Sequence, residues 1–186
     1  LEIISGFDEK DSTSINENVP KLINETTSEM DHIIGIPFKL IEKINDYKVK
    51  QNFLDCIDLL KKNGIKTKEI DLPFIEYSLP AYYVIAPAEC SANLSRYDGI
   101  KYGYRCENPK DLEDLYTRTR SEGFGEEVKK RILIGTYCLS AGYFDAYYLK
   151  AQKIRARITN SFKEAFKNVT VIAMPTCSNE AFELGS

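Results

Sequence analysis

Two residues in different predicted helices could bind a carboxylate. Tyr82 lies near the expected start of a helix, where its hydroxyl can meet a carboxylate beside unpaired backbone amides. Arg131 borders the apolar face of a later helix, between Val128 and Gly135. A guanidinium there can hold an amino-acid carboxylate through two parallel hydrogen bonds, which a lysine does less well. Both residues also have structural interpretations: Tyr82, like Tyr83, fits a core tyrosine with a satisfied hydroxyl, and Arg131 fits a surface charge cluster.

No nucleophile in the chain has a recognisable activating partner. His32 is the only histidine, and its surroundings favour a loop-end position before a strand over a catalytic one. The adjacent acids Glu126 and Glu127 would diverge by about 100° on a helix, which indicates first-turn acids and not a catalytic dyad. Four serines lack both a nearby histidine and a strand-to-helix elbow: Ser91, Ser95, Ser121 and Ser140. Dinucleotide, P-loop and zincin motifs are also missing from the sequence.

Two further clusters each allow a binding role and a simpler structural one. The tyrosines could stack on nucleic-acid bases, but the small residues around them favour close helix packing. They are Tyr137, Tyr143, Tyr147 and Tyr148, with Asp145 among them. A basic stretch could face tRNA or a partner protein, although a solvated helix face is the favoured interpretation. Its members are Lys150, Lys153, Arg155, Arg157, Lys163 and Lys167.

Composition is that of an ordinary globular domain. The 186 residues are 43% hydrophobic and 28% charged, and the net charge of −3 argues against a dedicated nucleic-acid-binding domain. The longest apolar runs are too short to span a membrane as a helix. The five cysteines are spread out, which excludes a CxxC pattern and favours reduced thiols in a reducing compartment, cytoplasmic or organellar. Because the chain does not begin with Met, we take it as a fragment of a longer protein.

The elements that would position these residues form an α/β fold. We expect one domain, with residues 1–32 as a polar, linker-like lead-in and residues 33–186 as the α/β body. The apolar run 33–37 predicts a strand buried on both faces, 51–63 an amphipathic helix, and 67–72 a second strand. A strand, helix and strand in this order predict parallel pairing.

The remainder is expected to be mostly helical. A helix should begin at about Leu79 and kink at Pro87, whose ring removes a backbone hydrogen bond. Another should begin at Asn108 and be interrupted at 121–125, and a third should resume at Glu126. A long helix over 143–166 and a closing strand over 169–176 complete the expectation.

One passage carries a resemblance. It reads Leu79-Pro80-Ala81-Tyr82-Tyr83-Val84-Ile85-Ala86-Pro87-Ala88-Glu89 and continues to Arg105 as CSANLSRYDGIKYGYR. It resembles the tRNA-dependent amidotransferase members of the amidase-signature family. The resemblance is most specific from about Leu79 to Gly185 and implies part of a mixed sheet flanked by helices. That family performs acyl transfer with a nucleophilic serine, a bridging serine in a cis peptide and a lysine base. The resemblance places these three groups upstream of Leu1, so we expect no catalytic residue in this chain.

The resemblance also implies a role for the two carboxylate-binding candidates. Tyr82 would contact a glutamine donor and Arg131 would bind it, while the family's acidic partner for the amino group would fall beyond Ser186. The complete protein would hydrolyse glutamine, and a B subunit would use the ammonia to convert glutamyl-tRNA(Gln) to glutaminyl-tRNA(Gln). A small C subunit is expected, ATP and magnesium would bind a partner subunit, and this chain would contact tRNA only indirectly and no membrane. The fragment alone is predicted to be inactive. Alternatives are a fragment of a general amidase of the same family and a non-catalytic interaction module.

Overall fold

The computed structural model describes residues 1–21, 23 and 32–185, which fall into two compact units, 1–32 and 33–186. In the first unit the described backbone forms turns held by local hydrogen bonds. Ser5 N donates to the Leu1 carbonyl over 3.0 Å, and Asp11 Oδ1 accepts from Thr13 N over 2.9 Å. The rest of the expected lead-in, residues 22 and 24–31, lies outside the described residues.

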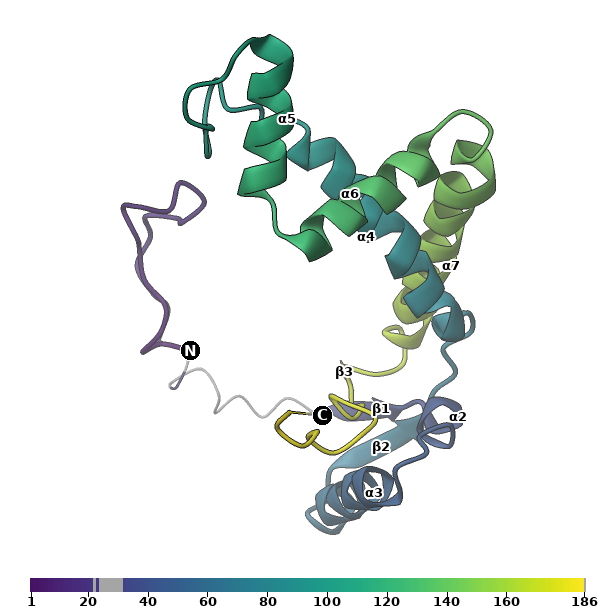
Figure 1. The fold of residues 1–186 in the computed structure, drawn as a ribbon. Helices are drawn as coiled ribbons and strands as arrows, with labels where there is room; N and C mark the ends of the chain where they lie inside the picture. Colours follow the sequence, from purple (N-terminus) through teal and green to yellow (C-terminus); the bar gives the residue numbers. More distant parts are fainter. Residues whose placement is uncertain (22, 24–31, 186) are drawn as a thin grey trace. The chain divides into compact units, whose positions relative to one another are not determined.

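The second unit contains a parallel sheet (Figure 1). Strands β1 (Ile33–Ile36), β2 (Lys66–Glu69) and β3 (Val171–Ile172) lie in the order β2-β1-β3, with both pairings parallel. The predicted α/β class and the parallel pairing of the first two strands are therefore confirmed. The second strand ends earlier than expected, and the third covers only two of the expected eight positions.

Alternation along β1 explains how the sheet is covered. Ile34 and Ile36 face a cluster with Ile41 of the short helix α2 (Phe38–Ile41) and Ile57 of α3 (Tyr47–Lys62). Ile33 faces the opposite side, where the buried residues are Ile70, Leu72, Ala165 and Val169. The strand thus contacts apolar side chains on both faces, as its continuous apolar run predicts.

Helix α3 begins at Tyr47, four residues before the predicted start, because Asp46 caps it. The Asp46 carboxylate accepts hydrogen bonds from Lys48 N at 3.0 Å and Val49 N at 3.2 Å. The same carboxylate accepts from Glu180 N at 3.1 Å, which ties the segment after β3 to the start of α3. The predicted end at Asn63 and Gly64 is confirmed, with Gly64 in the left-handed region at φ 82°.

Replacing Asp46 by alanine is expected to lower the melting temperature by about 2–4 °C through loss of the cap. Hydrogen bonds, first from Val49 N and then from Glu180 N, hold the pKa of Asp46 below its ordinary value of 3.8. A lowered folded-state pKa stabilises the protein above about pH 4, and this contribution disappears as pH falls through the lowered value. Thermal unfolding should show a smaller difference in melting temperature between the unchanged protein and Asp46→Ala at pH 3 than at pH 7. Asp58→Ala is the control, since the Asp58 carboxylate pairs with the Lys61 ammonium of the same helix at 3.4 Å and does not cap it.

Helices make up most of the rest of the second unit. The 3-10 turn Ile75–Tyr77 leads into α4 (Ser78–Leu94), which continues through Pro87 without a break. Helix α5 (Leu112–Gly123) starts later than predicted because Asp111 is its cap, accepting from Asp114 N over 2.8 Å. It also runs three residues into the predicted interruption at 121–125.

Helix α6 (Glu126–Leu139) resumes where expected. The long helix predicted over 143–166 is present in two parts, a π-helical segment, η2 (Phe144–Leu149), followed by α7 (Lys150–Ala165). Helix α4 packs against both α6 and α7 (Figure 1). Among residues 1–21, 23 and 32–185, no helix has both the length and the apolar character needed to cross a bilayer.

Candidate carboxylate-binding site

The structure brings the two predicted binding residues into contact. Arg131, in the second turn of α6, donates a hydrogen bond from Nη1 to the Tyr82 hydroxyl at 3.3 Å. Tyr82 lies in the second turn of α4, 49 positions earlier in the chain. Tyr82 is 48% exposed and Tyr83 59% exposed, so neither is a buried core tyrosine in this chain. The pair therefore presents a hydroxyl and a guanidinium together at the surface.

A close helix crossing produces this contact. Gly135 lies one turn after Arg131 and packs directly on the backbone of α4 at Pro87. A Cβ at Gly135 would lie 1.9 Å from the Pro87 carbonyl oxygen and 2.7 Å from Ser91 Cβ. Beyond the crossing, the hydroxyls of Ser91 and Thr136 are hydrogen-bonded at 2.8 Å. The two helices are thus joined by polar contacts on both sides of a glycine contact.

The contacts of Arg131 leave hydrogen-bond donors of the guanidinium and of Tyr82 available to a ligand. Glu127 Oε1 accepts from Arg131 Nε at 3.0 Å, and the two side chains are four positions apart on α6. Hydrogen bonding to the Tyr82 hydroxyl and then to Glu127 raises the pKa of Arg131, which stays charged. Because the Tyr82 oxygen accepts from Arg131, its own hydrogen is free to be donated to a ligand. Tyrosine and arginine can then both donate to one anionic group.

Tyr82 also forms the edge of an apolar groove between α4 and α7. The groove has a volume of about 310 Å³. Its walls are Ser78, Ala81, Tyr82, Ile85, Ala86, Arg155, Ile158 and Thr159. Tyr82 thus separates an apolar surface from the Arg131 guanidinium.

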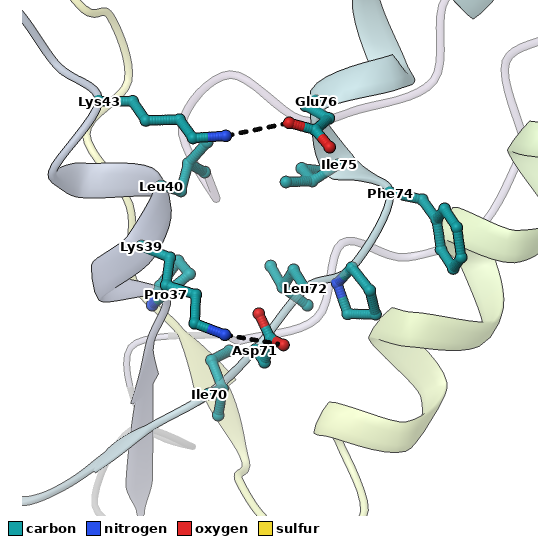
Figure 2. Close-up of a pocket in the computed structure, with 11 residues that line it drawn as sticks. Pro37, Lys39, Leu40, Lys43, Ile70, Asp71, Leu72, Phe74, Ile75 and Glu76 are labelled. Carbon is teal, nitrogen blue, oxygen red and sulfur yellow. Dashed lines mark hydrogen bonds and ion pairs between the residues drawn. The ribbon is translucent and has the colours of Figure 1, made fainter.

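A second hollow, of about 160 Å³, lies where β1 and β2 end, a common ligand position in α/β sheets. Figure 2 shows Lys39 and Lys43 of this hollow reaching across it to acidic partners. Lys39 Nζ lies 3.2 Å from Asp71 Oδ2, and Lys43 Nζ lies 3.0 Å from Glu76 Oε2. Its lysines are already paired with carboxylates, and its walls are largely apolar. We therefore interpret it as a junction that braces α2 against the segment after β2.

The remaining sequence candidates occupy structural positions. Glu126 and Glu127 diverge as predicted, with Glu126 paired to Lys129 at 2.8 Å. His32 is exposed and directly precedes β1. The hydroxyls of three serines donate to backbone carbonyls: Ser95, Ser121 and Ser140. The Ser91 hydroxyl is hydrogen-bonded to the Thr136 hydroxyl.

The tyrosine cluster packs mainly on itself. The ring centroids of Tyr137 and Tyr143 are 4.3 Å apart, and those of Tyr143 and Tyr147 are 5.9 Å apart. A hydrogen bond with Tyr143 and burial raise the pKa of Tyr137 to about 12. Tyr148 instead donates to Glu89 Oε1 of α4 at 2.8 Å. These contacts support the packing interpretation.

The basic stretch is divided between different surroundings. Arg157 lies over the ring of Phe74, 5.3 Å from its centroid, whereas Arg155 lines the α4–α7 groove. Lys167 is paired with Glu164 at 2.7 Å. Within the described ranges, no group of three or more His, Cys, Asp and Glu side chains is placed to hold a metal ion.

Sequence reasoning misses two contributors to the site. It assigns Glu127 only to the first helical turn, although a spacing of four from Arg131 signals an ion pair. It groups Gly135 with the small residues of a packed helix, but the contact with Pro87 has no signal in the sequence.

Comparison with known proteins identifies the family. A family model described as Amidase matches residues 1–186, the whole chain. The chain belongs to the amidase family. This confirms the resemblance, which is most specific from about Leu79 to Gly185.

Individual relatives of this amidase-family chain carry a more specific name. The A subunit of the glutamyl-tRNA(Gln) amidotransferase of Methylococcus capsulatus is 51% identical over 100% of the chain and 39% of its own length. The protein of the same name from Thioalkalivibrio sulfidiphilus is 54% identical over 98% of the chain and 38% of its own length. The chain therefore spans about two fifths of the relatives it matches.

Solved structures show the same relationship. A crystal structure of the glutamyl-tRNA(Gln) amidotransferase A subunit from Thermotoga maritima matches 99% of this chain and 35% of that one. The TM-score is 0.59 and the identity 35%. A second crystal structure, described as that of an amidase, matches 84% of this chain and 30% of its own chain. Its TM-score is 0.60 and its sequence identity 17%, so it supports the fold alone.

Proposed function

We propose that this chain is part of the A subunit of a glutamyl-tRNA(Gln) amidotransferase. The proposal is supported by identities near 50% over the whole chain to proteins of that name. The complete protein would hydrolyse glutamine, and the released ammonia would convert glutamyl-tRNA(Gln) to glutaminyl-tRNA(Gln) on a partner subunit. The partners would be a B subunit together with a small C subunit, and ATP and magnesium would bind outside this chain.

Within that activity, Tyr82 and Arg131 recognise the carboxylate of the glutamine donor. The observation that carries this role is the 3.3 Å contact between Arg131 Nη1 and the Tyr82 hydroxyl across the α4–α6 crossing. The guanidinium supplies paired donors that match the two carboxylate oxygens, and the tyrosine supplies a third donor. The serine–serine–lysine group that breaks the amide bond belongs to the part of the protein upstream of Leu1. The chain thus selects the substrate, and alone it is inactive.

Arg131→Lys and Tyr82→Phe in the complete, assembled enzyme test this role. Arg131→Lys removes the paired donors and should raise the KM for glutamine about 10- to 50-fold, whereas Tyr82→Phe should raise it about fivefold. Glutaminase kinetics measure both effects, and Lys130→Ala is the control on the same helix. An unchanged KM in Arg131→Lys would overturn the proposed role.

A simple aliphatic amide separates this function from that of a general amidase. Because such a substrate has no carboxylate, its hydrolysis should be the same in Arg131→Lys as in the unchanged enzyme. Equal losses for both substrates would instead indicate a structural role for Arg131.

A further inference from the structure

Glu127 contacts the Arg131 side chain on the same face of α6. It lies in the first turn of α6, after the cap residue Gly125, and Arg131 follows one turn later. Its Oε1 accepts from Arg131 Nε at 3.0 Å, within the range of a charge-assisted hydrogen bond. The Glu127 side chain is 68% exposed, so it has no part in a buried core.

The donors of Arg131 are divided between three directions. A guanidinium has five N–H groups and two edges that can each hold a carboxylate, Nε with Nη2 and Nη1 with Nη2. Glu127 occupies Nε, which closes the first edge. Tyr82 accepts one hydrogen from Nη1, which leaves the second Nη1 hydrogen and both Nη2 hydrogens.

We infer that Glu127 is a positioning residue that aims the Nη1–Nη2 edge of Arg131 at the glutamine carboxylate. This inference rests on the proposed function of Arg131. An arginine side chain has many rotamers, and holding it in one of them before the ligand arrives removes part of the ordering cost of binding. Tyr82 and Glu127 hold the guanidinium from two sides, so the ligand meets a fixed edge.

The neighbouring residue Glu126 offers a matched control. It has the same charge, lies in the same helical turn and makes an ion pair of similar length, 2.8 Å, but with Lys129. The general effect of an acid near a helix N-terminus is therefore common to both residues. Glu127, in contrast to Glu126, contacts the guanidinium that touches Tyr82.

The test compares Glu127→Ala, Glu127→Gln and Glu126→Gln in the complete, assembled enzyme. Glu127→Ala should raise the KM for glutamine about tenfold with kcat within about twofold, as expected for loss of one charge-assisted hydrogen bond. Glu127→Gln keeps an accepting oxygen and should recover part of the loss, to about threefold. Glu126→Gln should leave KM unchanged, and the melting temperature should be the same in all three.

A double variant distinguishes failure of this inference from failure of the proposed function. With Arg131→Lys already present, Glu127→Ala should change KM by less than about twofold, because the residue it positions is gone. If Arg131→Lys raises KM but Glu127→Ala does not, the positioning role is wrong and the proposed function stands. If Arg131→Lys itself has no effect, the proposed function fails first. A fall in melting temperature and kcat in Glu127→Ala would show a structural role and overturn the inference.

Discussion

Replacing Gly135 by alanine is expected to destabilise the protein by about 3 kcal/mol and to abolish most glutamine hydrolysis by the complete enzyme. The added Cβ would lie 1.9 Å from the Pro87 carbonyl oxygen and 2.5 Å from its carbonyl carbon. Both atoms belong to the backbone, so no side-chain rotation relieves the overlap and α4 and α6 must move apart. Alanine's better helix propensity returns only about 1 kcal/mol.

The same displacement should damage the site. Tyr82 and Arg131 lie on opposite helices of this crossing, and their 3.3 Å hydrogen bond does not survive a separation of even about 1 Å, by the usual limits of hydrogen-bond geometry. Urea unfolding measures the stability and glutaminase kinetics the activity. Gly125→Ser is the control: a Cβ at Gly125 meets nothing within 4 Å, and serine is a favourable helix cap. Full stability in Gly135→Ala would show that the crossing relaxes easily.

The local elements of the fold could be predicted because their signals are local. The apolar run at β1 and the cap at Gly64 each appear within a few residues, and both are observed. The predicted starts of two helices were wrong because a single capping side chain sets where each helix begins. Asp46 moved the start of α3, since a capping carboxylate outweighs the apolar period that suggested a later start. Asp111 likewise moved the start of α5 past the earlier start expected at Asn108.

The site could be predicted only as two separate candidates. Residue chemistry and family resemblance selected Tyr82 and Arg131, but their contact depends on a helix crossing that a single sequence does not encode locally. The crossing is set by the match between Gly135 and the Pro87 carbonyl, 48 positions apart in sequence. Such a match is a property of packed backbone, and a glycine within a helix does not by itself reveal which segment packs against it.

Exchanging Glu127 and Arg131, as the double variant E127R/R131E, should reduce kcat/KM for glutamine at least about 100-fold. The exchange keeps both charges and their spacing of four on α6, so an ion pair can still form. It moves the guanidinium one turn away from Tyr82 and places a carboxylate where the substrate carboxylate should bind. Like charges then face each other, which adds repulsion to the lost hydrogen bonds.

The exchange separates the position of the guanidinium from the existence of the ion pair. An arginine in the first turn of a helix is slightly unfavourable, so the melting temperature should fall by only about 1–3 °C. Hydrolysis of an aliphatic amide without a carboxylate should remain near that of the unchanged enzyme, because neither exchanged residue belongs to the proposed catalytic group. The double variant should therefore lose glutamine hydrolysis while keeping the hydrolysis of the aliphatic amide. If glutamine is still used normally by E127R/R131E, the ion pair alone matters and Arg131 does not bind the substrate.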